Sequence, residues 1–284
     1  MEKKIVDLCS QYVRGDFDRR AFLDQLGRIG AGATATFGLL AALKTDARAQ
    51  IVPQDDARLV AQKVEYDAQG VKISAYLARQ KEDKKRPAIL VIHENRGLNP
   101  HIQDVARRFA LEGFLALAPD MLSPVGGTPA DPAEAPRMIG SLKPEETVSR
   151  LAAGVAFLAS HPSSTGKVGV VGFCWGGAMV NRLAAAGAGL QAAVSYYGSQ
   201  LPPEEVPRIS APLLLHYAEL DTRINAGIAG FEAALTENKK VYEKYMYEGA
   251  NHAFNNDSNP QRYNKEAATL AWTRTIAFFK KYLV

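Results

Sequence analysis

The segment that most restricts how this chain can fold is residues 168–179, where a run of strand type passes directly into a helical pattern. The turn between them reads Gly172-Phe173-Cys174-Trp175-Gly176-Gly177. Such a sharp strand-to-helix turn needs glycine, because the apex residue has a strained backbone and its neighbours lie in close contact. Cys174 occupies the apex, facing a helix N-terminus that favours an anion. The pattern predicts a nucleophile elbow with cysteine as the nucleophile; the alternative is a Gly-rich turn around an inert cysteine.

Strand and helix patterns alternate along the chain from residue 63 onward. Strands are expected at 63–67, 71–78, 88–93, 114–118, 168–173, 191–197, 212–217 and 241–247. Helices are expected at 101–112, 144–159, 175–188, 226–238 and 265–282, with a short one at 134–139. We therefore predict an α/β three-layer sandwich with an eight-stranded, mostly parallel sheet and an opening antiparallel hairpin. The segment from Pro119 to Pro144 is too short for a large lid domain.

An acid and a histidine follow the elbow in the order expected of a hydrolytic triad. Asp221 lies in the loop after the seventh predicted strand, and His252 lies in the loop after the eighth. Because parallel strands place their carboxyl ends at one edge of the sheet, both side chains should meet Cys174 there. Cys174 would attack a carbonyl as the thiolate, and His252 would transfer protons. Asp221 would orient the imidazole and stabilise its charged form.

Other acids and histidines are weaker candidates for these roles. Glu219 precedes Asp221 by two residues, but the chain leads from Asp221 directly toward a helix. His216 lies inside a predicted strand and is expected to be a core residue. His161 precedes a proline in a helix-end loop, and His101 lies in a first helical turn.

The third predicted strand ends in His93-Glu94-Asn95-Arg96-Gly97, where we expect the second half of an oxyanion hole. The backbone N–H groups of Asn95 and Trp175 would bind the developing oxyanion together. Glu94 would face the same space, where its carboxylate could hold the thiol neutral until substrate arrives. The alternative is that Glu94 and Arg96 form an ordinary loop salt bridge.

Composition excludes several classes of function. With 284 residues, 47% of them hydrophobic, the chain can bury one large core. Its net charge is only +4, which is too small for a nucleic-acid surface. The two cysteines, Cys9 and Cys174, lie in different parts of the chain, and no Cys/His cluster has zinc-ligand spacing. We expect no disulfide, no metal and no nucleic-acid partner.

Residues 1–49 read as a leader that precedes a linker at 50–62 and the main domain at 63–284. The leader contains Asp18-Arg19-Arg20-Ala21-Phe22-Leu23-Asp24, an apolar stretch at 29–43 and a small-x-small site at 47–49. It resembles a twin-arginine export signal, which implies a periplasmic location. An N-terminal helix packed on a cytoplasmic domain is the alternative. Fifteen apolar residues are too few for a permanent membrane span.

Taken together, the motifs resemble the dienelactone hydrolase family over essentially the whole chain from residue 63. The matching residues are Gly172 to Gly177, His93 to Gly97, Ala118-Pro119-Asp120, Asp221 and His252. The resemblance implies an α/β-hydrolase fold, a Cys–His–Asp triad, no cofactor and hydrolysis of the lactone ester in carboxymethylenebutenolide. It also implies that Glu94 interacts with the nucleophilic cysteine.

The chain departs from this family pattern at the substrate-binding positions. Family members that act on dienelactone carry an arginine four residues after the histidine, where this chain has Asn256. Arg137 matches a second carboxylate-binding arginine only approximately, and Arg96 is a further candidate. We therefore expect a cysteine-dependent hydrolase of small esters or lactones. The alternatives are a promiscuous thioesterase, aryl esterase or phosphotriesterase, or a non-catalytic envelope binding protein.

Overall fold

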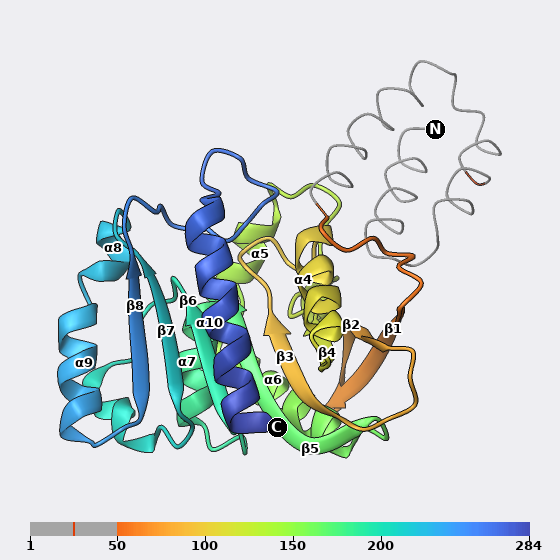
Figure 1. Cartoon of the computed structure of the whole chain (residues 1–284), viewed down its shortest axis with the longest axis horizontal. Helices are drawn as coiled ribbons and strands as arrows, with labels where there is room; N and C mark the ends of the chain where they lie inside the picture. The colour runs from red at the N-terminus through yellow and green to blue at the C-terminus, as the bar shows by residue number, and fades with distance from the viewer. Residues whose placement is uncertain (1–24, 26–49) are drawn as a thin grey trace.

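The computed structural model of the chain describes residue 25 and residues 50–284 (Figure 1). The predicted export signal, its cleavage site and Cys9 lie outside the described residues.

An eight-stranded sheet forms the centre of the described chain, in the order β1-β2-β4-β3-β5-β6-β7-β8. The strands are β1 (Leu59–Ala68), β2 (Val71–Gln80), β3 (Arg86–Ile92), β4 (Leu115–Pro119), β5 (Ser164–Phe173), β6 (Ala192–Tyr196), β7 (Leu213–Ala218) and β8 (Tyr242–Tyr247). Strands β3 to β8 run parallel, whereas β1 and β2 pair antiparallel with each other and β2 pairs antiparallel with β4. The predicted mostly parallel sheet with its opening hairpin is confirmed.

Helices cover both faces of this sheet, as expected of a three-layer sandwich (Figure 1). They are α4 (Pro100–Leu111), α5 (Ala135–Gly140), α6 (Pro144–Ser160), α7 (Trp175–Ala185), α8 (Thr222–Asn225), α9 (Ile228–Glu237) and α10 (Lys265–Leu283), with 3-10 turns η1 (Ser123–Val125) and η2 (Pro203–Arg208). One apolar core lies under α4 and α10, and the other lies under α6, α7 and α9. In the described part of the chain, no helix combines the length and apolar character needed to cross a membrane.

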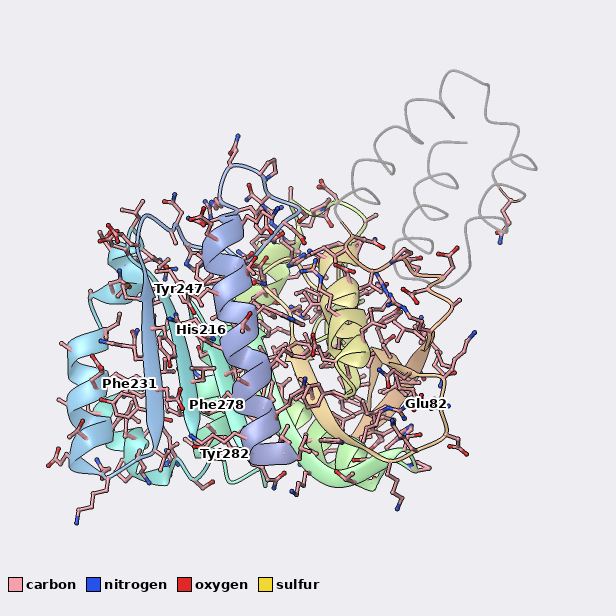
Figure 2. The ribbon with its side chains drawn as sticks, viewed as in Figure 1. Glu82, His216, Phe231, Tyr247, Phe278 and Tyr282 are labelled. Atoms are coloured by element: carbon pink, nitrogen blue, oxygen red, sulfur yellow. The ribbon has the colours of Figure 1, made fainter. Side chains whose placement is uncertain are left out.

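His216 is the core histidine that its strand position predicted. Its side chain is fully buried beneath α10, near Tyr247 (Figure 2). The two ring nitrogens contact the hydroxyls of Thr275 and Tyr247 at 3.0 and 2.9 Å. Burial lowers the pKa of this imidazole to about 3, so His216 stays neutral inside the core.

Element ends differ from the prediction where local pairing extends or stops an element. Strand β1 begins at Leu59, inside the predicted linker 50–62, because all ten of its residues pair with β2. Helix α7 ends at Ala185, shortly before Gly187 adopts a φ of +70°. The short segments η2 and α8 were not expected, since a single turn carries no periodic signal.

The turn between β5 and α7 has the geometry of a nucleophile elbow. Cys174 adopts φ 56° and ψ −115°, a strained combination for a residue with a side chain. A Cβ on Gly172 would lie 2.3 Å from the carbonyl oxygen of Gly176. A Cβ on Gly176 would lie 2.5 Å from the carbonyl oxygens of both Ile92 and His93. The helix can therefore begin against the end of β3 only because these two positions lack side chains.

Replacing Gly176 by Ala should destabilise the fold, because the new methyl group meets two backbone oxygens that cannot move independently of the sheet. We expect the free energy of unfolding to fall by about 1–3 kcal/mol. Gly230→Ala is the matched control: it lies inside α9 with nothing within 4 Å of the added Cβ, so stability should rise by about 0.5–1 kcal/mol. Urea unfolding of both variants measures this, and equal effects would contradict the packing argument.

Candidate active site

A cavity of about 760 Å³ opens at the carboxyl edge of the sheet, and both Cys174 and His252 line it. The elbow positions Cys174 at its base, and the loop after β8 carries His252. His252 Nδ1 forms a short hydrogen bond with Asp221 Oδ2, and Asp221 is 7% exposed. Among the described residues, no hydrogen bond joins the thiol to the imidazole in this state. The structure thus brings the three predicted residues to one edge of the sheet.

Asp221, rather than Glu219, is the partner of His252. Its Oδ1 also accepts a hydrogen bond of 3.4 Å from the N–H of Ile224, as the N-cap of α8. The Glu219 carboxylate instead accepts a hydrogen bond of 2.8 Å from the N–H of Gly249. Both oxygens of Asp221 are therefore held, which fixes the orientation of the imidazole.

The Cys174 thiol lies in surroundings that favour its neutral form. Burial and the negative charge of Glu94 raise its pKa to about 11. The backbone N–H of Trp175 and the charge of Arg223 oppose this rise but do not cancel it. The free site therefore holds a thiol at neutral pH, as the sequence suggested for a cysteine beside a carboxylate.

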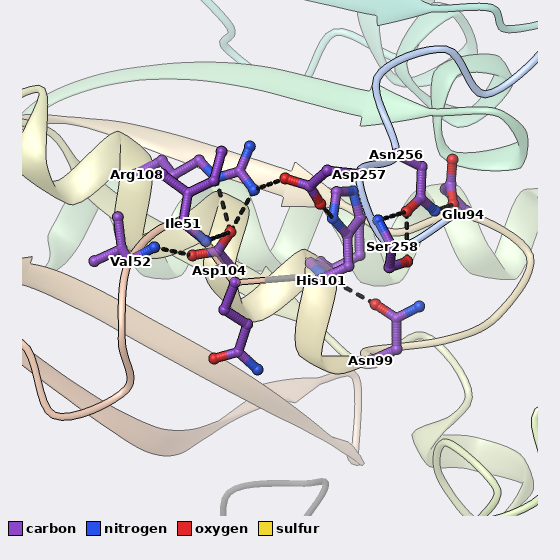
Figure 3. Close-up of polar contacts among 12 residues, drawn as sticks. Ile51, Val52, Glu94, Asn99, His101, Asp104, Arg108, Asn256, Asp257 and Ser258 are labelled. Carbon is purple, nitrogen blue, oxygen red and sulfur yellow. Dashed lines mark hydrogen bonds and ion pairs between the residues drawn. The ribbon is translucent and has the colours of Figure 1, made fainter. Parts of the chain in front are cut away.

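Glu94 is buried and held by two neutral hydrogen-bond donors. Tyr197 Oη donates to Glu94 Oε1 at 3.2 Å. Asn256 Nδ2 donates to Glu94 Oε2 at 2.6 Å (Figure 3). Tyr197 follows β6 with a φ of 39°, and its ring centroid lies 5.0 Å from that of His252. Asn256 Oδ1 accepts from Ser258. Sequence reasoning missed Tyr197, although its position at the carboxyl end of a central strand was a usable signal.

A second polar network holds the loop that carries His252 and Asn256 (Figure 3). His101 Nδ1 lies 2.9 Å from Asp257 Oδ1, and Arg108 pairs with both Asp257 and Asp104. Asp104 in turn accepts a hydrogen bond of 2.8 Å from the N–H of Val52. Burial alone would raise the pKa of the Asp257 carboxyl, but the hydrogen bond to His101 and the charge of Arg108 outweigh it and lower the pKa. The loop is thereby tied to α4 and to the first described residues.

The two predicted oxyanion donors lie in the loop after β3 and at the N-terminus of α7. Asn95 is partly buried and lines the cavity, and its backbone N–H has no hydrogen-bond partner among the described residues. The backbone N–H of Trp175 faces the Cys174 sulfur, where it lowers the pKa of the thiol. The Asn95 N–H thus has no protein partner in the described chain, whereas the Trp175 N–H lies at the sulfur.

The predicted arginines lie in different places. Arg96 lines the cavity, is exposed and donates a hydrogen bond of 3.1 Å to the carbonyl oxygen of Pro132. No ion pair joins it to Glu94 within the described residues, so the loop salt bridge considered above does not form. Arg137 is exposed on α5 and does not line the cavity.

Two further arginines, Arg223 and Arg262, line the cavity beside His252. Both are exposed, and neither makes an ion pair with any described residue. Arg223 lies two residues after Asp221, and Arg262 lies in the long loop before α10. Arg223 is close to Asp221 in sequence, but no motif marked either arginine. In the same described region, no group of three His, Cys, Asp or Glu side chains is arranged to hold a metal ion.

Comparison with known proteins finds sequences similar to most of this chain. A family model described as the dienelactone hydrolase family matches residues 73–283. A protein from Escherichia coli strain K12, named provisionally as a carboxymethylenebutenolidase, is 33% identical over 248 residues, which cover 82% of this chain and 91% of the relative. A protein from Saccharolobus solfataricus with the same provisional name is 32% identical over 252 residues, covering 76% and 96%.

Solved structures extend the similarity to the fold. A provisionally assigned dienelactone hydrolase from Klebsiella pneumoniae superposes with a TM-score of 0.73 at 28% identity, covering 79% of this chain and 99% of the other. A dienelactone hydrolase-like promiscuous phosphotriesterase from metagenomic libraries superposes with a TM-score of 0.71 at 25% identity, covering 80% and 100%.

Replacing Glu94 by Gln should make the Cys174 thiol more reactive, because it removes a negative charge that raises the thiol pKa. Alkylation by iodoacetamide at pH 7.5 should accelerate about three- to fourfold for each unit by which the pKa falls. A Cys9→Ala background leaves Cys174 as the single thiol. Glu219→Gln, which removes an exposed carboxylate outside the cavity, should leave the rate unchanged. An unaltered rate in Glu94→Gln would contradict the electrostatic argument.

Proposed function

This chain belongs to the dienelactone hydrolase family, and we propose that it hydrolyses small carboxylic esters or lactones through a thioester formed on Cys174. The family assignment establishes an ester or lactone hydrolase. The observation that carries the finer proposal is Cys174 at the apex of a strained elbow, in the same cavity as an imidazole already bonded to a buried carboxylate. A cavity of about 760 Å³ suits a small-molecule substrate.

The first half-reaction transfers the acyl group to sulfur. His252 accepts the thiol proton, and the thiolate attacks the ester carbonyl carbon to form a C–S bond. The carbonyl electron pair moves onto oxygen, where the N–H groups of Asn95 and Trp175 stabilise the oxyanion. When the tetrahedral intermediate collapses, the ester C–O bond breaks and His252 protonates the leaving alkoxide. A thioester on Cys174 remains.

The second half-reaction releases the acid and regenerates the thiol. Neutral His252 removes a proton from water, and the resulting hydroxide attacks the thioester carbonyl. The same two N–H groups stabilise the second oxyanion before the C–S bond breaks. The thiolate then recovers its proton from the imidazolium, whose charge Asp221 stabilises throughout. The opened lactone or free acid leaves the cavity.

Turnover of p-nitrophenyl acetate by Cys174→Ala tests the nucleophile. We expect kcat/KM to fall by at least about 10³-fold, because no other group can form the acyl-enzyme. Cys9→Ala is the matched control and should retain full activity. Mass spectrometry of the rapidly quenched wild type should show one acetyl group on the peptide containing Cys174. Equal rates for Cys174→Ala and the wild type would contradict the assignment of Cys174 as the nucleophile.

The charge around the cavity favours esters that carry a negative group. Arg96, Arg223 and Arg262 line it, whereas its one acidic side chain, Glu94, is buried and hydrogen-bonded. Arg223→Gln and Arg262→Gln should each raise KM for an anionic ester several-fold and leave KM for a neutral ester of equal size unchanged, as lost charge-assisted contacts would. Arg137→Gln, outside the cavity, is the control. Equal changes for both esters would contradict the preference.

A second activity is supported by the resemblance to the promiscuous phosphotriesterase. The same pair of N–H donors would bind a phosphoryl oxygen as well as a carbonyl oxygen. Assay of a p-nitrophenyl phosphotriester beside the carboxylic ester measures this. Loss of both activities in Cys174→Ala would assign them to one nucleophile.

We also propose that residues 1–49 direct twin-arginine export to the periplasm, on the basis of Arg19-Arg20 and the site at 47–49. The folded domain extends back to the predicted site, because Gln50 and Val52 accept hydrogen bonds from the buried Arg107. Mass spectrometry of fractionated cells should find an N-terminus at Gln50, and a double Arg19→Lys, Arg20→Lys variant should remain unprocessed. An intact Met1 in the cytoplasmic fraction would reject export.

A further inference from the structure

His93, at the end of β3, is a fully buried histidine with a fixed tautomer. Its Nδ1 lies 2.6 Å from the carbonyl oxygen of Glu94, and its Nε2 lies 3.2 Å from the backbone N of Met121. A carbonyl can only accept and a backbone N–H can only donate, so Nδ1 carries the proton. Burial lowers the pKa of the ring, which keeps it neutral. His93 is therefore a one-way hydrogen-bond bridge between two backbone segments.

The carbonyl that His93 holds belongs to the same peptide unit as the N–H of Asn95. A trans peptide is planar, and its C=O and N–H point in opposite directions. The described chain contains no cis peptide bond. When the imidazole fixes the Glu94 carbonyl on the buried side, it aims the Asn95 N–H toward the opposite side. Asn95 itself lines the cavity.

The same imidazole also contacts the residue that carries the other oxyanion donor. Its ring stacks on the indole of Trp175 with centroids 5.3 Å apart and planes 17° apart. The backbone carbonyl of His93 packs against Gly176, where a Cβ would approach to 2.5 Å. His93 thus touches both sides of the proposed oxyanion hole, although it does not line the cavity itself.

We propose that His93 is the positioning residue of the oxyanion hole, holding the Glu94–Asn95 peptide so that its N–H meets the oxyanion. The inference rests on the proposed function, because it assigns a role in the same reaction. A buried hydrogen bond on one end of a peptide is well suited to this, since it fixes the donor before the charge develops. The Met121 N–H fixes the tautomer of the ring, because the opposite tautomer would leave both contacts unsatisfied.

A matched pair of variants separates the two hydrogen bonds of the ring. His93→Asn places an amide N–H near the position of Nδ1 and retains the donor to Glu94. His93→Gln reaches the position of Nε2 and retains the acceptor for Met121. We expect kcat to fall about 10- to 100-fold in His93→Gln, part of the 10²–10³ that a whole donor contributes, with KM little changed. His93→Asn should recover most of the loss. Equal kcat values in the two folded variants, or the reverse order, would overturn the proposal.

Two reagents that react with the thiol distinguish a positioning role of His93 from a general loss of structure in the site. An aldehyde forms a thiohemiacetal on Cys174 whose oxygen occupies the oxyanion site, so its affinity should fall in parallel with kcat in His93→Gln. Iodoacetamide alkylates the thiolate without forming an oxyanion, so its rate and pH profile should stay at the wild-type level in a Cys9→Ala background. Alkylation that falls as much as kcat would assign His93 a merely structural role. If wild-type Cys174 is not acylated by ester at all, the proposed function fails instead.

Discussion

The close approach of α7 to the ends of β3 and β5 is the contact on which the rest of the site depends. Gly172 and Gly176 leave room for backbone to meet backbone, and Cys174 takes its strained φ as a consequence. Because α7 begins at that point, the Trp175 N–H faces the sulfur and the helix N-terminus lies behind it. Any side chain at Gly176 would separate the nucleophile from the loop of Asn95, since that loop follows β3 directly.

Opposing electrostatic effects meet at the Cys174 sulfur. The helix N-terminus and Arg223 favour a thiolate, whereas burial and Glu94 favour a thiol, and the thiol prevails with a pKa of about 11. A neutral resting thiol resists alkylation and oxidation, because the thiolate is the reactive form. In the proposed mechanism His252 accepts the thiol proton as the thiolate attacks, and Asp221 stabilises the imidazolium that results.

The elbow and the arrangement of Cys174, Asp221 and His252 at one edge of the sheet were predictable because each has a sequence signal that is local. Glycines mark the turn, and Asp221 and His252 follow strands whose ends must share one edge of the sheet. The contacts that tune the site were not predictable, because each joins residues far apart in sequence. Glu94 meets Tyr197 and Asn256 across 103 and 162 residues, and their types alone gave no reason to pair them. The early start of β1 could not be predicted for the same reason, since it depends on pairing with β2.

Asn256 stands where the family pattern has an arginine, and in this structure its amide contacts Glu94. Asn256 is 8% exposed and lines the cavity, and its amide forms hydrogen bonds with Glu94 and Ser258. Asn256 donates a hydrogen bond to Glu94 but carries no positive charge, so it does not neutralise the Glu94 charge that raises the pKa of the thiol. Positive charge lies instead on Arg223 and Arg262, which are exposed at the mouth of the cavity. Exposed charges are screened within about 10 Å at 0.1 M salt, whereas buried ones are screened much less. The preference for anionic esters should therefore weaken as ionic strength rises, which an arginine at the buried position of Asn256 would have prevented.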